Sequence, residues 1–439
     1  MTKGILFLIA GTIVLWPYQM EVRGTSLRFF AIGFLLSLIL GGFLLLQGGR
    51  WKSLFRKSLI IYLLFAGMHV IGYLFGGNSI WELSHNSYLT EFLVSFFFFL
   101  LVIGLIETRE AYGRMVLWIV LGTSALAVIL LYRHLFVFDV TFLTQFFSEE
   151  GFRGLGAFNK NTFAFFLLLF FPFAYSYFTH KRNLLGTLTV LVMGAGIVFV
   201  LSRMALCASF LSMALLCLGG FKKRLYIVQL AILSGVILLG CLLFQVGPQH
   251  YMVWKNTAID GIPRDPSEFP LDKSFKGSRW RYVRKALEGF GDKPILGHGL
   301  NTFSLDHKQY CVGGDEHCLE TRGGGSVFCS LEEEACQAMT GGGTLIRYPG
   351  THNDYALILY ELGATGLLLF LGIFWDLLRR LWQARSYIND SIRWVWDGQI
   401  ASLVAMFFAI NFINAYYTIP FLFLLAGGYI LAQRASETA

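Results

Sequence analysis

The chain is poor in charged residues: 14% of its 439 residues are Asp, Glu, Lys or Arg, whereas 56% are hydrophobic. An ordinary soluble domain has about 25% charged residues, so this composition excludes that class. A membrane-spanning helix needs about 20 mostly apolar residues. Runs near that length predict an all-α, multi-pass membrane protein with about twelve transmembrane helices, at 4–18, 29–46, 59–76, 88–106, 115–132, 161–178, 184–201, 204–220, 225–245, 353–375, 398–415 and 418–433.

Several signatures of common enzymes and transporters are also absent. The chain has no Walker motif, no Asp-x-Asp cluster for a nucleotide-sugar metal, and no Gly-x-Ser-x-Gly elbow. The apolar runs hold few ionisable residues, notably His69, Glu91 and Glu361. A proton- or ion-coupled transporter is expected to carry more of them inside the membrane.

Lysines and arginines gather in alternate short loops, as the positive-inside rule requires. The loop at 77–87 has neither residue, whereas the loops around 50–57, 109–114, 181–182, 222–224 and 379–393 are basic. This alternation predicts that both termini are cytoplasmic and that the long loop is external. The first run has no cleavage site and is expected to stay as an anchor. The net charge of +8 then reflects topology, and nucleic-acid binding is not needed to explain it.

The predicted organisation has three parts. Residues 1–245 form nine transmembrane helices, 246–351 form the large periplasmic loop, and 352–439 form the last three helices. Within the loop, the proline-rich segment 246–278 is expected to be irregular. Residues 279–290 place Trp280, Val283, Leu287 and Phe290 at helical spacing, which predicts an amphipathic helix on the membrane surface. The glycine clusters of 311–347 indicate a mobile flap.

Four of the seven cysteines lie in the external loop. An even number in an oxidising compartment predicts two disulfides, with three possible pairings. A zinc site that uses His317 is an alternative, although the spacings lack close Cys-x-x-Cys pairs. Unpaired thiols are the remaining alternative. These cysteines are Cys311, Cys318, Cys329 and Cys336.

Arginines at the outer membrane boundary are candidates for binding a phosphate group. Arg203 lies between two apolar runs, where a charge is costly unless it reaches the interface or a partner. It either extends to lipid phosphates or grips a substrate phosphate, for which the planar guanidinium is suited. Arg279 is the first choice within the loop, because it begins the predicted helix. Arg281 and Arg284 are secondary candidates, and a basic helix attracted to anionic lipid is the alternative.

His352 is the candidate general base, because it stands where the external loop re-enters the membrane. Its near-neutral pKa suits removal of a proton from a hydroxyl; a structural histidine is the alternative. Glu361 lies nine residues further, about 13 Å along a continuous helix. A carboxylate at that depth in the membrane is unusual. Its role is either in catalysis or in helix packing. His298 and His307 are weaker candidates.

Four motifs follow one another along the chain. They are Phe158-Asn159-Lys160-Asn161; Leu201-Ser202-Arg203; Arg279 with Pro294-Ile295-Leu296-Gly297-His298-Gly299 and Phe303; and His352-Asn353-Asp354-Tyr355 with Glu361-Leu362-Gly363 and Gly366. In this order they resemble the bacterial O-antigen ligase family, within the O-antigen ligase/polymerase superfamily. The resemblance covers most of the chain, and it adds Asn161, Asn353 and Tyr355 as secondary candidates. One departure is Val283, where many relatives have Trp.

The resemblance implies a membrane glycosyltransferase that needs no metal or other cofactor. It would transfer O-antigen polysaccharide from undecaprenyl diphosphate to a sugar hydroxyl of lipid A-core, at the periplasmic face of the bacterial inner membrane. Arg203 and Arg279 would hold the diphosphate, and His352 would act as base in an inverting reaction. Grooves between helices would take the polyprenyl tail, and membrane lipids would surround the protein.

Two kinds of alternative stay open. An O-antigen polymerase or a protein O-oligosaccharyltransferase would use the same donor with another acceptor; a C-terminal domain for binding protein is not expected after the last span. A transporter of lipid-linked glycan is the alternative from another class. A transporter would move the donor without cleaving its diphosphate bond.

Overall fold

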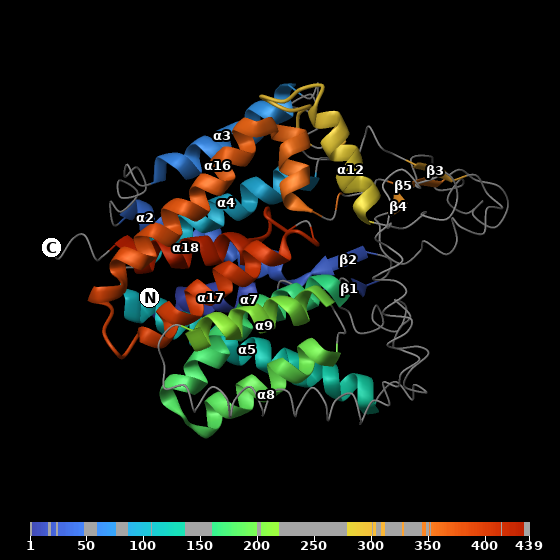
Figure 1. Cartoon of the computed structure of the whole chain (residues 1–439). Helices are drawn as coiled ribbons and strands as arrows, with labels where there is room; N and C mark the ends of the chain where they lie inside the picture. Colours follow the sequence, from blue (N-terminus) through green and yellow to red (C-terminus); the bar gives the residue numbers. More distant parts are fainter. Residues whose placement is uncertain are drawn as a thin grey trace.

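The computed structural model places most of the chain in helices that lie side by side in one bundle (Figure 1). The helical fold class is therefore confirmed in its main feature. The residues that the structure describes are 2–15, 19–22, 25–47, 59–75, 87–106, 108–136, 160–199, 203–218, 279–300, 302–303, 309–311, 327–328, 345–347, 351, 353–413 and 415–433.

The bundle helices form where the apolar runs were found, and the run at 225–245 lies outside the described residues. Long apolar stretches favour helices in a membrane because a helix satisfies its own backbone hydrogen bonds. The described bundle helices are α1 (Thr2–Leu15), α2 (Phe29–Gln47), α3 (Ile60–Phe75), α4 (Ser87–Leu105), α5 (Arg109–Phe136), α7 (Lys160–Lys181), α8 (Leu184–Phe199), α9 (Arg203–Leu218), α16 (Asp354–Ala384), α17 (Arg393–Ala409) and α18 (Ile419–Gln433).

Three stretches among the described helices are long and apolar enough to cross a membrane: Arg109–Ile129, Phe163–Lys181 and Asp354–Tyr387. Seven other apolar helices in the described part are shorter, with 10–17 residues each. The helices are those of a membrane protein. The count of twelve spans and the division at residues 245 and 351 stay predictions.

The central helix of the bundle is α7. Its residues 163–176 are buried, and it packs most extensively against α17, with further contacts to α5, α8 and α9. The Ser402 hydroxyl of α17 donates a hydrogen bond to the Leu169 carbonyl at 2.8 Å. A helix that is apolar on every face is stable when other helices surround it, so α7 organises the core.

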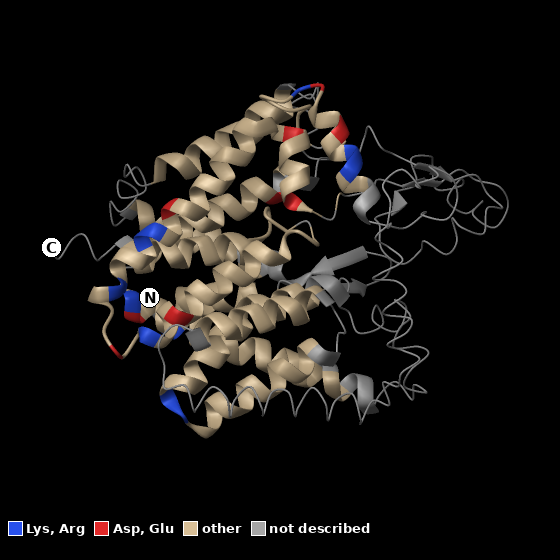
Figure 2. Ribbon diagram, viewed as in Figure 1, with Lys and Arg blue, Asp and Glu red and all other residues tan. Residues whose placement is uncertain are grey.

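Charged residues of the described part gather toward the two ends of the bundle (Figure 2). At one end lie the basic segments 109–114, 181–182 and 379–393, where α1 begins and α18 ends (Figures 1 and 2). The short helix α12 (Arg279–Phe290) lies at the other end. This arrangement agrees with the alternation of basic loops. We call the end with α12 the outer end and the opposite end the inner end.

Five short strands were not predicted, and they leave the helical fold class unchanged. Each strand has only two to four residues, too few for a clear alternating pattern. An antiparallel hairpin joins α1 to α2, and a second antiparallel sheet with the order β3-β5-β4 forms within the predicted external loop. The strands are β1 (Gln19–Val22), β2 (Thr25–Arg28), β3 (Gln309–Cys311), β4 (Val327–Phe328) and β5 (Leu345–Arg347).

The disulfide prediction has no support. Cys311 ends β3, and its backbone pairs with that of Leu345 in β5. Cys318, Cys329 and Cys336 lie outside the described residues, as do His317 and the segment 246–278. The pairing of these cysteines therefore stays a prediction. The movement of the flap at 311–347 is likewise untested.

Candidate functional site

Helix α12 has the bounds that the sequence predicted, but its buried face differs. Tyr282 and Ala286 are buried, and Val283 packs beside them. Leu287, which was predicted to share the apolar face, is 46% exposed. Helix α12 packs along α16 (Figure 1), and the contact of its predicted apolar face with the membrane surface stays a prediction. Of the basic candidates on α12, Arg284 forms an exposed ion pair with Glu288, with Nε and Oε1 2.7 Å apart.

Helix α16 is interrupted at Gly363, so the continuous helix expected there is wrong. Gly363 has φ 66° and ψ −168°, and the next two N–H groups leave the helical hydrogen-bond pattern. The segment 294–299 supplies the missing partners. The bonds are Ala364 N to Pro294 O (2.8 Å), Thr365 N to Ile295 O (3.2 Å), His298 N to Tyr360 O (2.9 Å) and Gly299 N to Glu361 O (2.9 Å).

Two glycines allow this close approach of backbone to backbone. A Cβ on Gly297 would lie 2.5 Å from the Glu361 carbonyl, and Gly297 has a φ of 73°. A Cβ on Gly363 would overlap the Ile295 carbonyl. Only glycine accepts both the positive φ and the contact at low cost. The glycines of this motif therefore have a structural cause.

His298 links the interruption to the end of α12. Its ring stacks on Tyr360, with the ring centroids 4.4 Å apart and the planes at 11°. Its Nε2 lies 2.8 Å from the Gly289 carbonyl in α12. A carbonyl only accepts, so Nε2 carries the proton and donates. Gly289 has no side chain, and the Tyr360 ring fills the space where one would stand.

The first residues of α16 are anchored by buried polar contacts. Asn353 caps the helix, because its Oδ1 accepts from Ala356 N at 2.9 Å. The Asp354 carboxylate is fully buried and accepts from Ala415 N and Tyr416 N, each at 2.9 Å. These bonds hold the start of α16 against the loop between α17 and α18.

Two further bonds strengthen the same contact. The Tyr355 hydroxyl donates to the Phe407 carbonyl at 2.8 Å, and Asn353 Nδ2 donates to the Asn411 carbonyl at 3.1 Å. Asn353 and Tyr355 thus bond to the backbone of other elements. Their part in any reaction stays a prediction.

Behind this anchor lies a buried histidine of α3. His69 stacks on Phe92 with the ring centroids 3.8 Å apart. Its Nδ1 donates to the Phe65 carbonyl at 2.8 Å, so Nε2 accepts from the Tyr416 hydroxyl at 3.3 Å. Tyr416 therefore connects His69 to Asp354, because its hydroxyl bonds to His69 and its backbone N–H bonds to the Asp354 carboxylate. This arrangement explains a histidine inside an apolar helix, and it supports the anchor.

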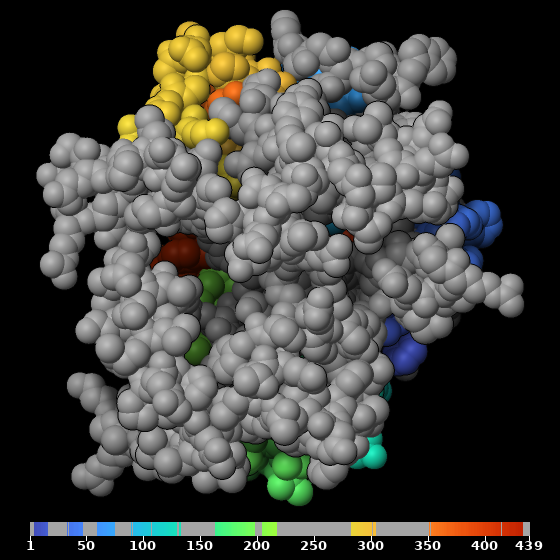
Figure 3. Space-filling model, turned by 90° about the vertical axis from the view of Figure 1, so that its right-hand side faces the viewer, coloured from blue at the N-terminus to red at the C-terminus, as the bar shows by residue number. Residues whose placement is uncertain are grey.

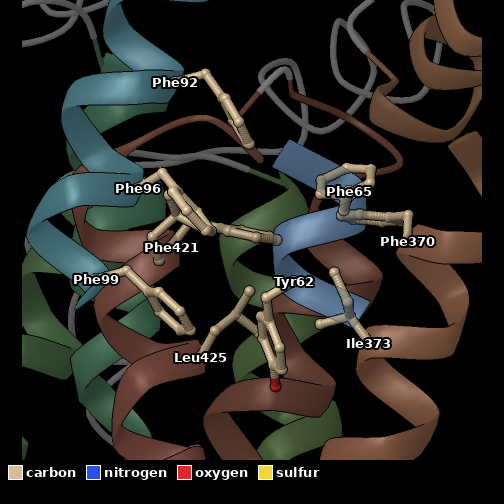
Figure 4. A pocket seen from close by; sticks show the side chains of 10 residues that line it. Tyr62, Phe65, Phe92, Phe96, Phe99, Phe370, Ile373, Phe421 and Leu425 are labelled. Carbon is tan, nitrogen blue, oxygen red and sulfur yellow. The ribbon is translucent and has the colours of Figure 1, made fainter. Parts of the chain in front are cut away.

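An aromatic pocket lies deeper in the bundle, between α3, α4, α16 and α18 (Figure 4). The labelled side chains point toward one another and leave little polar surface. We assign this pocket to the core. The grooves expected for a polyprenyl tail stay a prediction. The lining residues are Tyr62, Phe65, Phe92, Phe96, Phe99, Phe370, Ile373, Phe421, Leu422 and Leu425.

Three helices that carry candidate residues begin at the outer end: α9, α12 and α16 (Figure 1). Figure 3 shows this end face-on, with α12 at its upper edge and smaller green and dark red areas below it. Helix N-termini present unpaired N–H groups and favour anions. The helix N-termini at the outer end are therefore suited to binding a negatively charged group.

The structure places the backbone of several candidates and leaves their side chains undescribed. Arg203 begins α9, Arg279 begins α12, Arg281 follows in α12, and Asn161 lies in the first turn of α7. His352 lies outside the described residues, as does His307. The flanking Thr351 and Asn353 are described, and Asn353 N donates to Thr351 Oγ1 at 3.2 Å.

Glu361 lies next to the interruption and not midway along a continuous span. Its side chain is 3% exposed, and its carbonyl is bonded to the segment 294–299. Its role in catalysis stays untested.

Sequence reasoning gave no role to three residues of this region: Asp354, which stands within a quoted motif, and Tyr360 and Gly289. Asp354 carried a usable signal, because a carboxylate at the start of a long apolar helix favours the helix N-terminus. Tyr360 and Gly289 carried none, since their contact joins segments about 70 residues apart.

The bundle and its outer end define the class: a mainly helical membrane protein with a polar end built from interrupted and capped helices. A family model described as O-antigen ligase matches residues 188–318, and this match supports membership of the O-antigen ligase superfamily. The matched region includes Arg203, Arg279 and His298 and ends before His352. No curated protein matches the chain.

Proposed function

We propose that this protein is an O-antigen ligase. It transfers polysaccharide from undecaprenyl diphosphate to a sugar hydroxyl of lipid A-core. The single observation that carries the proposal is the O-antigen ligase match over 188–318, which includes both arginines chosen for the diphosphate. The gathering of the α9, α12 and α16 N-termini at one end of the bundle supports it (Figure 1).

In this proposal Arg203 and Arg279 bind the diphosphate. Their guanidinium groups stay charged and match phosphate oxygens in two-point contacts. As the diphosphate leaves, its negative charge grows, and the two arginines and the helix N-termini stabilise that charge. This stabilisation is larger in the transition state than in the bound donor, so it speeds the reaction.

His352 accepts the proton in the same step. The acceptor hydroxyl oxygen attacks the anomeric carbon of the donor glycan and forms the new glycosidic bond. The bond from that carbon to the diphosphate oxygen breaks, and its electron pair leaves with undecaprenyl diphosphate. The hydroxyl proton moves to His352. A single direct displacement inverts the anomeric centre.

The proposed location is the bacterial inner membrane, with the outer end in the periplasm and both termini in the cytoplasm. The beginning of α1 and the end of α18 lie together at the end opposite α12 (Figure 1), which supports this orientation. Lipid A-core enters from the surrounding lipid, and no nucleotide is needed because the donor carries its own leaving group.

The test is a reaction of purified protein with undecaprenyl-diphosphate-linked glycan and lipid A-core. We expect glycan-bearing lipid A from the wild type. We expect His352→Ala to lower the rate by at least about 100-fold, since general base catalysis contributes about 10²–10⁴. Arg279→Lys should keep part of the rate and Arg279→Ala much less, because lysine keeps the charge but loses the fork.

The matched control is Arg379→Ala, which removes an exposed arginine at the inner end. It should leave the rate unchanged. Longer donor chains with untouched lipid A would indicate a polymerase, and glycan on protein would indicate an oligosaccharyltransferase. A donor that crosses vesicles uncleaved would indicate a transporter. Full activity of His352→Ala, Arg203→Ala and Arg279→Ala would contradict the mechanism.

A further inference from the structure

The outer end contains a connection between α12 and α16 that the proposed reaction does not by itself explain. Two backbone hydrogen bonds of α16 are replaced by four bonds to the segment 294–299. The same segment continues to Leu300, whose N–H donates to the Gly72 carbonyl of α3 at 3.0 Å. We call residues 294–300 the clamp.

The clamp determines the direction of α16 on either side of Gly363. Before the interruption, α16 runs beside α12, and after it the helix crosses the bundle (Figure 1). An interrupted helix in an apolar environment needs new partners for its backbone groups, because an unpaired group there costs several kcal/mol. The clamp supplies those partners, so the first turns of α16 keep this direction.

The clamp also holds α12. His298 donates to the Gly289 carbonyl and stacks on Tyr360, so one side chain contacts both helices. Phe303 also packs edge-on with the Tyr360 ring, with the ring centroids 5.2 Å apart. The contact between Gly289 and Tyr360 brings the two helix axes close at this level.

The contact between Gly289 and Tyr360 sets the relative heights of the two helix N-termini. Helices α12 and α16 run in the same direction and begin at the same end (Figure 1). From Gly289 back to Arg279, α12 extends about 15 Å, and from Tyr360 back to Asn353, α16 extends about 10 Å. The two starts therefore differ in height by roughly 5 Å.

We propose that His298 is a positioning residue: through the clamp it keeps α12 parallel to the first turns of α16, and so sets Arg279 relative to His352. This proposal rests on the proposed function for the roles of Arg279 and His352. The clamp itself rests on described contacts alone. A shift of α12 would move the bound diphosphate away from the base, and misplacement by about 1 Å can cost about 100-fold in rate.

Two readouts test the proposal on the full-length protein in lipid nanodiscs. The first readout is amide hydrogen exchange, which measures how firmly the clamp holds α12 and needs no substrate. In His298→Ala we expect faster exchange in α12 and unchanged exchange in α17. The control Glu288→Gln removes only an exposed ion pair of α12 and should change neither. His298→Phe keeps a stacking ring and should restore part of the protection.

The second readout is the rate of glycan transfer. We expect His298→Ala to lower kcat about tenfold, with the KM for lipid A-core within about twofold of wild type. In an Arg279→Lys background the further loss should be under about twofold, because residues that act through one another are not additive. A fully additive loss, or unchanged exchange of α12 in His298→Ala, would overturn the proposal.

The two failures are distinguishable. If wild-type protein transfers no glycan, the proposed function fails, and the exchange data still decide whether the clamp holds α12. If wild type is active and His298→Ala has both normal exchange and normal kcat, the ligase stands and the positioning role is wrong.

Discussion

The two parts of α16, before and after Gly363, differ in how their backbone and side chains are stabilised. The outer part, Asp354–Leu362, begins with a capping side chain and a buried carboxylate, and it ends at an interruption bonded to the clamp. The inner part, 364–384, bears a partly exposed Arg380–Asp376 pair. It turns large apolar side chains outward: Leu368, Trp375 and Trp382 are 69%, 72% and 65% exposed.

The difference shows where a membrane helix needs other segments. The inner part satisfies its own backbone, so its surface side chains need only suit lipid. The outer part gives up helical bonds and depends on α3, α12 and the loop before α18. Such irregular backbone is tolerated at membrane depth where protein surrounds it. The outer part is accordingly where we place the proposed chemistry.

The largest expected effect on stability comes from the buried carboxylate of the outer part. Asp354→Ala leaves the N–H groups of Ala415 and Tyr416 without their acceptor. At about 1–3 kcal/mol for each orphaned group, we expect a loss of about 3 kcal/mol of unfolding free energy. Both of these bonds reach the same carboxylate oxygen, Oδ2, so Asp354→Asn keeps an oxygen that can accept from both N–H groups and should lose much less. Unfolding in mixed detergent and SDS micelles measures both, and equal losses would contradict this account.

The interruption comes next. Gly363→Ala places a Cβ against the Ile295 carbonyl at a φ of 66°, a backbone region open almost only to glycine. We expect a loss of about 2 kcal/mol in the same unfolding experiment. The control is Gly67→Ala in α3, where nothing lies within 4 Å of the new Cβ. That variant should be neutral or up to about 1 kcal/mol more stable.

A smaller effect is expected for the hydroxyl of Tyr355. Tyr355→Phe removes one hydrogen bond to the Phe407 carbonyl and keeps the ring, which packs edge-on against Phe407. The expected loss is about 1 kcal/mol. A loss as large as that of Asp354→Ala would show that the anchor depends on the hydroxyl and not on the carboxylate.

The smallest effect is expected in the inner part of α16. Asp376→Asn removes a partly exposed pair with Arg380, whose Nε lies 2.8 Å from Asp376 Oδ2. Pairs of this kind contribute about 0.3–0.5 kcal/mol. If this variant destabilised the protein as much as Gly363→Ala, the conclusion that the two parts of α16 differ in their dependence on other segments would be wrong.

The sequence predicted the bounds of helices better than it predicted the contacts between them. The bounds of α12 were right, because its apolar residues recur at helical spacing over twelve positions. The burial of Tyr282 and Ala286 was not predicted, because α12 has apolar residues on more than one side and the sequence did not show that α16 packs along it. The short strands β1–β5 were missed, since two to four residues give no usable period.

The candidate site shows the same limit. Residue type and order alone selected Arg203, Arg279 and His352, and the family match covers the two arginines. The roles of all three stay predictions. The sequence offered no reason to join His298 to Tyr360, or Gly297 to Gly363, because these contacts close long loops between separate helices.

Hydropathy by itself determined that this protein is a bundle of apolar helices, because burying backbone in lipid leaves the helix as the stable form of each long run. Basic loops likewise indicated the alternation of helix direction. Only the tertiary structure decided where α16 breaks. A glycine within an apolar run is compatible with a straight helix, and the break at Gly363 is stable because the clamp replaces the hydrogen bonds that it removes.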